Sequence, residues 1–164
     1  MLILGIDPGL ATVGFGFVEH IGSSTFIAGE YGAVLTSSKM KTEDRLAEIF
    51  ENVQELVKKY RPDAVSIEKL FFNTNEKTAI NVAQARGVIL LAVRLAGIPI
   101  YEYTPLQIKQ ALTGYGRAEK KQIMYMVKTI LKLKSVPKPD DTADALAAAI
   151  CHGYASSSIL LGLK

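Results

Sequence analysis

Four carboxylates lie next to apolar stretches, at positions where a charged side chain is unusual. Asp7 ends the first apolar stretch and is followed by Pro8, which cannot extend a central strand. Glu68 closes the fourth strand-like stretch directly after apolar residues. Asp141 and Asp144 lie three residues apart at the start of the last expected helix, so they share a face. If the first and fourth strands are neighbours and this helix packs across their ends, all four side chains converge.

Such a cluster indicates a metal site. Unpaired carboxylates in a partly buried site repel one another, and a divalent cation removes that repulsion. Oxygen-only ligands select hard ions, so we expect Mg²⁺ with Mn²⁺ as a substitute. Two such ions per active site can hold the attacking water and the leaving 3′ oxygen of a phosphodiester in line. The two histidines, His20 and His152, give little support to histidine acid–base chemistry, and His152 is expected to be a packing residue.

Each of these residues also has a simpler explanation. Asp7 could form an Asp-Pro-Gly turn, Glu68 could pair with a nearby cation, and Asp140 or Asp141 could cap a helix. Asp144 is harder to explain in this way because it interrupts an alanine-rich stretch. The four explanations together are less probable than one shared site.

The stretch GIDPGLATVGFG, residues 5–16, surrounds Asp7 with four glycines and admits another interpretation. Actin-like and sugar-kinase-like ATPases open with a similar hairpin that grips phosphate. Such proteins need a second comparable domain and a second phosphate hairpin, for which 164 residues leave no room. The glycines are therefore interpreted as structural: Gly9 allows the turn, while Gly14 and Gly16 leave little bulk on the second strand.

Hydrophobic periodicity and breaker residues predict one α/β domain over residues 1–164, with a mixed five-stranded sheet flanked by helices. The expected strands are 2–7, 12–19, 25–35, 64–68 and 98–103. The expected helices are about 43–60, 77–96, 104–114, 118–133 and 141–155. Helix 77–96 is apolar on more than one face, so it either forms a homodimer contact or lies beneath another helix of the same chain.

The charge distribution indicates a polyanionic partner. The net charge is +3, and the lysine-rich segment 109–138 contains a single acidic residue, Glu119. Such a segment is typical of proteins that contact phosphates, although a solvent-exposed helix face can have the same composition. The single cysteine, Cys151, excludes an internal disulfide and suits the cytoplasm. No signal peptide is expected, and the longest apolar run, 88–93, is too short to span a membrane.

Four motifs in order carry a family resemblance: GIDPGLATVGFG, SIEKLFF around Glu68, NVAQARGV on the long helix and DDTADALAAAICH near the end. Together with EYTPLQIKQALTGYGRAEKKQI they resemble the RuvC family of bacterial Holliday junction resolvases over essentially the whole chain. The resemblance implies an RNase H-like fold, a homodimer and Mg²⁺-dependent nicking of two opposed strands of a four-way DNA junction. It also implies a role in recombination and repair, with the branch-migration proteins RuvA and RuvB as partners.

The resemblance also implies roles for individual residues. The catalytic and metal-binding carboxylates of the family fall on Asp7, Glu68, Asp141 and Asp144, which leaves Asp140 to cap the helix. A non-catalytic junction-binding protein is the remaining alternative, and the complete quartet argues against it.

Five further residues are implied to contact DNA. The family's aromatic wedge at the junction centre corresponds to Phe71, and Phe72 beside it could share that role. Lys109 and Lys120 match basic positions near the active site that would hold the scissile phosphate, and Lys121 is assigned with them.

Overall fold

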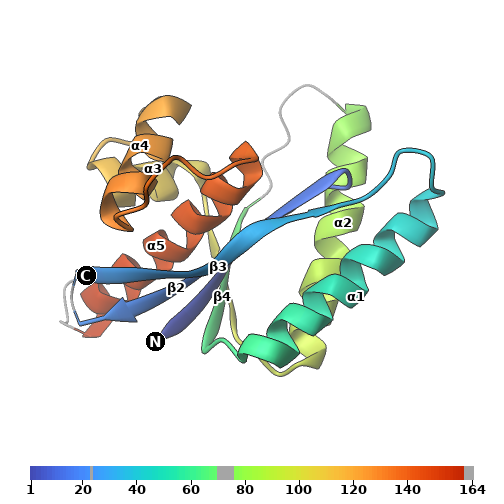
Figure 1. The fold of residues 1–164 in the computed structure, drawn as a ribbon, viewed down its shortest axis with the longest axis horizontal. Coiled ribbons are helices and arrows are strands. Elements are labelled where there is room, and N and C mark those ends of the chain that lie inside the picture. Colours follow the sequence, from blue (N-terminus) through green and yellow to red (C-terminus); the bar gives the residue numbers. More distant parts are fainter. Residues whose placement is uncertain (23, 70–75, 161–164) are drawn as a thin grey trace.

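The computed structural model describes residues 1–22, 24–69 and 76–160 (Figure 1). Five strands form one sheet, and all five expected strands and five expected helices are present. The strands are β1 (Leu2–Asp7), β2 (Thr12–Ile21), β3 (Thr25–Leu35), β4 (Ala64–Glu68) and β5 (Ile100–Tyr103). The helices are α1 (Thr42–Tyr60), α2 (Glu76–Leu95), α3 (Pro105–Thr113), α4 (Lys120–Ile130) and α5 (Asp140–Leu160).

The strand order explains how distant carboxylates can meet. The sheet runs β3-β2-β1-β4-β5, in which β2 is antiparallel to both β1 and β3, and β4 is parallel to both β1 and β5. Ile6 is in register with Ile67, so the carboxyl ends of β1 and β4 lie at the same edge of the sheet. The prediction that the first and fourth strands are neighbours is confirmed.

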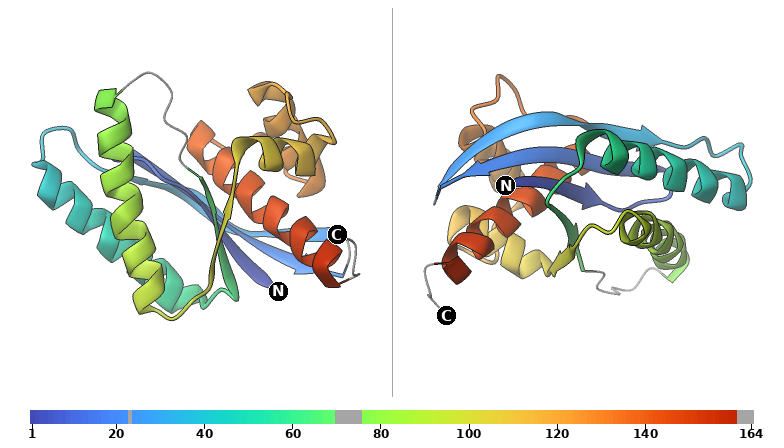
Figure 2. Two further views of the ribbon diagram at one scale, coloured as in Figure 1. Left: turned by 180° about the vertical axis from the view of Figure 1, so that it is seen from behind. Right: turned by 90° about the horizontal axis from the view of Figure 1, so that it is seen from below.

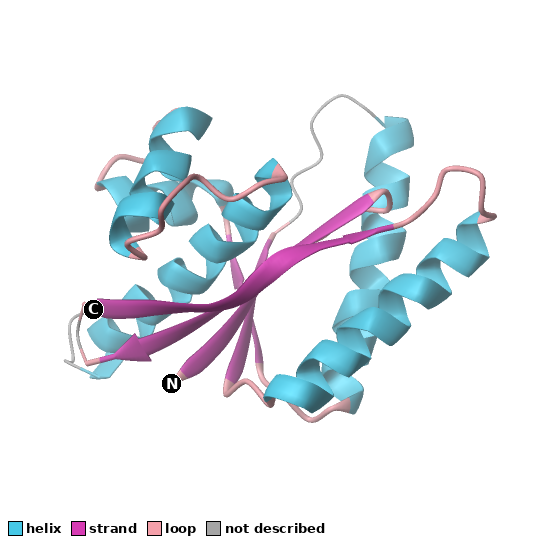
Figure 3. Cartoon of the chain, viewed as in Figure 1, coloured by secondary structure: helices cyan, strands magenta, loops and turns pink. Residues whose placement is uncertain are grey.

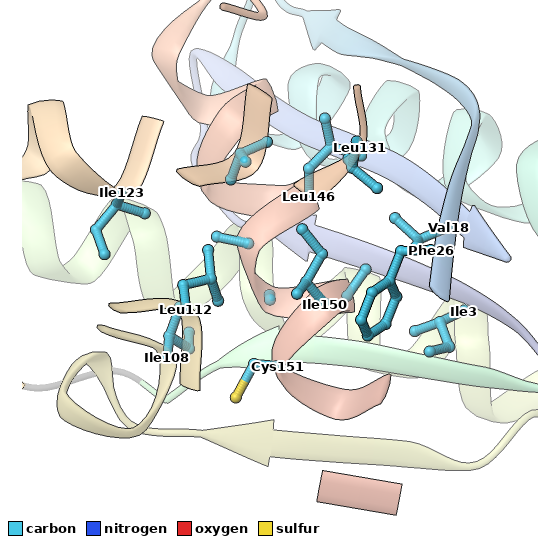
Figure 4. Packing of buried hydrophobic residues seen from close by; sticks show 14 of the residues in the cluster. Ile3, Val18, Phe26, Ile108, Leu112, Ile123, Leu131, Leu146, Ile150 and Cys151 are labelled. Carbon is cyan, nitrogen blue, oxygen red and sulfur yellow. The ribbon is translucent and has the colours of Figure 1, made fainter. Parts of the chain in front are cut away.

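Two layers of helices cover the sheet. Figures 1 and 2 show α1 and α2 over one face, and α5 with α3 and α4 over the other. Successive side chains of β1 alternate between these layers: Leu4 and Ile6 are buried against α1 and α2, whereas Ile3 is buried against α5. Figure 3, coloured by secondary structure, shows the sheet between these two groups of helices. Figure 4 shows the hydrophobic core between the sheet and α5, around Leu146 and Ile150.

Several boundaries differ from those expected. Helix α4 is shorter than 118–133: the Glu119 N–H donates to the Gln122 side chain (2.8 Å) just before the helix, and Lys132 adopts a left-handed backbone (φ 53°) after it. Helix α5 starts at Asp140, directly after Pro139, and extends beyond residue 155. The expected N-cap of α3 is confirmed, because the Thr104 hydroxyl accepts from the Gln107 N–H at 3.1 Å.

Helix α2 buries one side and exposes the other. Ala85, Ile89 and Val93 face the core beside α1, whereas Ile80 and Leu91 are 60% and 52% exposed. The outer face of α2 is therefore not covered by the chain's own described residues, and the homodimer contact stays a prediction. None of the helices in the described ranges has the length and hydrophobicity required to cross a membrane.

Candidate active site

Glycines on β1 and β2 set the position of the last helix. A Cβ atom on Gly5 would overlap the backbone carbonyl oxygen of Ala145, and one on Gly14 would overlap that of Asp141. Gly14 pairs with Asp7 across the β1–β2 ladder, so the first turn of α5 rests directly beside the Asp7 strand. These glycines have a structural role, as expected: Gly5, Gly14 and Gly16 leave room for α5, rather than only reducing bulk on a hairpin.

Two hydrogen bonds, one buried and one partly buried, hold α5 in this place. The Thr142 hydroxyl donates to the Gly32 carbonyl of β3 (3.0 Å), and the Ser66 hydroxyl of β4 donates to the Ala148 carbonyl of α5 (2.6 Å). Ser66 lies two residues before Glu68, so the side chains of both residues project from the same face of β4 toward α5. Asp141 and Asp144 on α5 are therefore brought to the edge where Asp7 and Glu68 end their strands.

Asp7 has the most perturbed environment of the four. The pKa of its carboxyl is raised to about 8, first by burial and then by the negative charges of Asp144, Asp141 and Glu68, while Lys120 opposes the rise. These neighbours come from β4 and from the first turns of α5, so all three carboxylates lie within electrostatic range of Asp7. At neutral pH and without a cation, Asp7 therefore holds a proton.

Glu68 and Asp144 share this environment. Burial raises the pKa of the Glu68 carboxyl, the charge of Asp144 raises it further, and Lys109 opposes the rise. Burial likewise raises the pKa of the Asp144 carboxyl, while contact with Lys120 counteracts it. The two lysines thus offset only part of the repulsion in the cluster.

Lys120 is the cation closest to the acidic cluster among the described residues. Its Nζ atom lies 3.2 Å from Asp144 Oδ2 and 3.4 Å from Asp140 Oδ2. Burial lowers the pKa of Lys120, but the two carboxylates outweigh burial and the net shift is upward. The assignment of Asp140 to helix capping needs correction: Asp140 is already the first residue of α5, and its carboxylate contacts Lys120.

A cavity of about 290 Å³ opens between the acidic cluster and helices α3 and α4. Its polar lining is contributed by Glu68, Asp144, Lys109 and Lys120. Two of the three predicted phosphate-binding lysines therefore border two of the four predicted catalytic carboxylates. The third, Lys121, is exposed and does not line this cavity. Phe71 and Phe72 lie outside the described residues.

The donor set suits a hard divalent cation. All four side chains offer carboxylate oxygens, and the carboxylates of Asp144, Asp141 and Glu68 each add to the rise in the pKa of Asp7 that a bound cation would oppose. Within the described ranges, no three acidic, histidine or cysteine side chains are close enough together to ligate one ion as they stand. The chemistry of the cluster therefore fits a cation, and coordination requires the side chains to turn toward it.

Three polar contacts were not foreseen from the sequence. Lys120 joins Asp140 to Asp144, and Arg86 of α2 forms an ion pair with Glu102 of β5. The Tyr103 hydroxyl lies 2.7 Å from His152 Nδ1 on the far part of α5, in agreement with a packing role for this histidine. These partners are separated by 16 to 49 positions in the chain, and no local pattern marks them.

Comparison with known proteins identifies close relatives. The profile of the family described as "Crossover junction endodeoxyribonuclease RuvC" matches residues 3–152. The protein of that name from Alkaliphilus metalliredigens is 57% identical over 154 residues, which cover 94% of this chain and 93% of the relative. The protein of the same name from Brevibacillus brevis is 57% identical over 166 residues, which cover 100% of this chain and 99% of the relative.

Solved structures agree with these sequence matches. The structure titled "T. thermophilus RuvC in complex with Holliday junction substrate" has a TM-score of 0.92 at 37% identity and covers 99% of this chain and 97% of its own. A yeast mitochondrial Holliday junction resolvase, Ydc2, has a TM-score of 0.67 at 14% identity, which shows likeness of fold alone. The expected RNase H-like architecture is confirmed.

Proposed function

The chain belongs to the RuvC family of crossover junction endodeoxyribonucleases, and from this we propose that its acidic cluster is the centre that cuts DNA. The protein is a Holliday junction resolvase, a nuclease that hydrolyses phosphodiester bonds. The observation that carries the residue assignment is the electrostatic coupling of Asp7 to Glu68, Asp141 and Asp144 at one sheet edge. We assign both catalysis and metal binding to these four residues.

The metal is proposed to be Mg²⁺, with Mn²⁺ as a substitute and two ions per active site. When bound, the ions supply Lewis-acid stabilisation of the phosphodiester and a hydroxide-like nucleophile. The four carboxylates would hold the ions, and a cation bound there would favour the ionised form of Asp7, whose pKa is raised without it. This proposal is supported by the oxygen donor set and by the metal dependence of the family.

The lysines and phenylalanines receive separate roles. Lys109 and Lys120 line the cavity beside Glu68 and Asp144, where an ammonium group can hold a phosphate oxygen of the substrate. Lys121 adds a further phosphate contact from the exposed side of the helix. Phe71 and Phe72 are proposed to stack on unpaired bases at the junction centre, at about 1–3 kcal/mol per base.

Paired symmetrical nicks require two active sites on one junction. We therefore propose that the protein acts as a homodimer, formed through the uncovered face of α2. RuvA and RuvB are proposed as functional partners because they accompany this family in recombination and repair. The cytoplasm is the proposed place of action, since a single buried cysteine suits a reducing compartment.

The test is cleavage of a labelled four-way junction in Mg²⁺ by an Asp7→Asn variant. The amide cannot bind a divalent cation as a carboxylate does, so we expect nicking to fall by at least about 100-fold while junction binding persists. The matched control is Asp44→Asn on the exposed first turn of α1, which should nick as the parent does. Undiminished nicking by Asp7→Asn would remove Asp7 from the active site.

A further inference from the structure

The face of α4 that points away from the core carries a row of basic residues with one tyrosine. Ile123 and Val127 are buried on the inner side of this helix. Lys121, Tyr125 and Lys128 follow at spacings of four and three on the opposite side, and Tyr125 is 64% exposed. Lys132 continues the row in the turn after the helix. We call these four residues the α4 basic stripe.

The charge of this stripe is not neutralised by the protein itself. No aspartate or glutamate occurs in residues 120–139 of the sequence. Of the described residues, none forms an ion pair with a lysine of the stripe, whereas the adjacent Lys120 contacts two carboxylates. A solvated helix face of a stable protein usually intersperses both signs, so this uniform charge favours an anionic partner.

The stripe is continuous with the candidate active site. Helix α4 begins at Lys120, which borders the cavity beside Asp144, and Figure 2 shows α4 on the same side of the sheet as α5. An 11-residue helix is about 16 Å long. At 3.4 Å per base pair, this length corresponds to about five base pairs of duplex. A DNA backbone held at the carboxylates can therefore continue along α4.

We propose that the α4 basic stripe binds the phosphate backbone of a duplex arm of the junction, about five base pairs away from the phosphodiester that is cut. The lysines contact phosphates as point charges, and the Tyr125 hydroxyl donates to a phosphate oxygen. The stripe reads no base sequence, because it contacts only the backbone. The DNA bound by the stripe is the same four-way junction that the active site cuts, so this inference rests on the proposed function.

The first test measures how junction affinity depends on salt, in EDTA so that cleavage plays no part. Each phosphate contact adds about 0.9 to the slope of log K against log salt, so Lys128→Gln combined with Lys132→Gln should reduce the slope by about two. The matched control combines Lys39→Gln and Lys58→Gln, two exposed lysines on the α1 side that form no ion pair with any described residue. An unchanged slope, or an equal reduction in the control, would overturn the proposal.

The second test locates the contact by hydroxyl-radical footprinting of the same complexes. The parent should protect backbone about five base pairs along an arm, and the double variant should lose this protection while it keeps protection at the crossover. Loss of both regions together would contradict a separate arm contact. If the parent protein binds junctions but does not nick them in Mg²⁺, the proposed function is wrong. The binding measurements would still show whether the α4 basic stripe contacts DNA.

Discussion

At the scale of single residues, the candidate site is a compromise between catalysis and stability. Asp7 lies beside three carboxylates, and only Lys120 lowers its pKa noticeably. Folding the chain without a bound cation therefore brings like charges together, which disfavours the folded state. A repulsive cluster of this kind is the arrangement that the proposed metal site would require.

This repulsion predicts an unusual pH dependence for the cation-free protein. The pKa of Asp7 rises on folding from 3.8 to about 8, so the folded state binds more protons than the unfolded state between these values. The free energy of unfolding should therefore fall as pH rises, by up to about 4 kcal/mol between pH 5 and pH 8 from this residue. Urea unfolding in EDTA at both pH values measures the change.

Asp7→Asn provides the comparison for that measurement. The amide does not titrate, so the variant should lose less stability between pH 5 and pH 8 and should be more stable than the parent at pH 8. Equal losses in parent and variant would show that Asp7 has an ordinary pKa in the folded protein.

At the scale of elements, the close approach of α5 to the β1–β2 hairpin decides where two of the carboxylates lie. Gly5 and Gly14 remove the atoms that would hold the helix away, and Thr142 bonds its first turn to β3. The sheet edge supplies Asp7 and Glu68, and the helix supplies Asp141 and Asp144. A small displacement between helix and sheet would separate these pairs.

Gly14→Ala tests this arrangement. Its Cβ atom would overlap the backbone carbonyl of Asp141, which cannot rotate aside as a side chain can, so α5 must shift. We expect a loss of about 2–3 kcal/mol in the free energy of unfolding and a larger loss in nicking than that instability explains. Urea unfolding and junction cleavage below the unfolding transition give the two quantities.

Gly32→Ala on β3 is the matched control. There a Cβ atom would meet the Phe15 ring at 3.4 Å, an ordinary contact. This variant should keep the stability and activity of the parent. If both variants behave alike, the close approach of α5 to Gly14 does not position the carboxylates.

At the scale of the whole molecule, the two helical layers have different tasks. The layer of α3, α4 and α5, seen together in Figure 1, borders the acidic cluster and carries the α4 basic stripe. The layer of α1 and α2 exposes apolar side chains of α2, among them Ile80, Leu91 and Leu95. An exposed apolar helix face of this kind is typical of a contact between subunits.

Leu91→Glu tests whether this face joins two copies. The side chain is 52% exposed in the isolated chain, so glutamate there should leave the fold intact but place a charge in an apolar interface. We expect sedimentation equilibrium to show monomers for this variant where the parent forms dimers. Leu35→Glu, at a 64% exposed leucine of β3, is the control and should remain dimeric. Dimers of both variants would place the contact elsewhere.

Much of the fold could be predicted because the signals for its elements are local. Alternating or helical spacing of apolar residues, the Thr104 cap and the Gly97 stop each depend on a few neighbouring positions. The boundaries of α4 were less accurate, since the left-handed turn at Lys132 has no marker in the sequence. The long helix 77–96 was predicted correctly. Which of its faces is exposed could not be predicted, because that depends on which other elements pack against it.

The candidate site divides in the same way. The sequence alone determined the types and order of the carboxylates, because an acid after an apolar strand and a pair on one helix face are visible in a few residues. Only the tertiary structure decided that Gly14 lies under Asp141, that Lys120 joins Asp140 to Asp144, and that Lys109 borders Glu68. These contacts join segments that are distant in the chain, and they arise only when α5 packs against the sheet and α3 and α4 pack against α5.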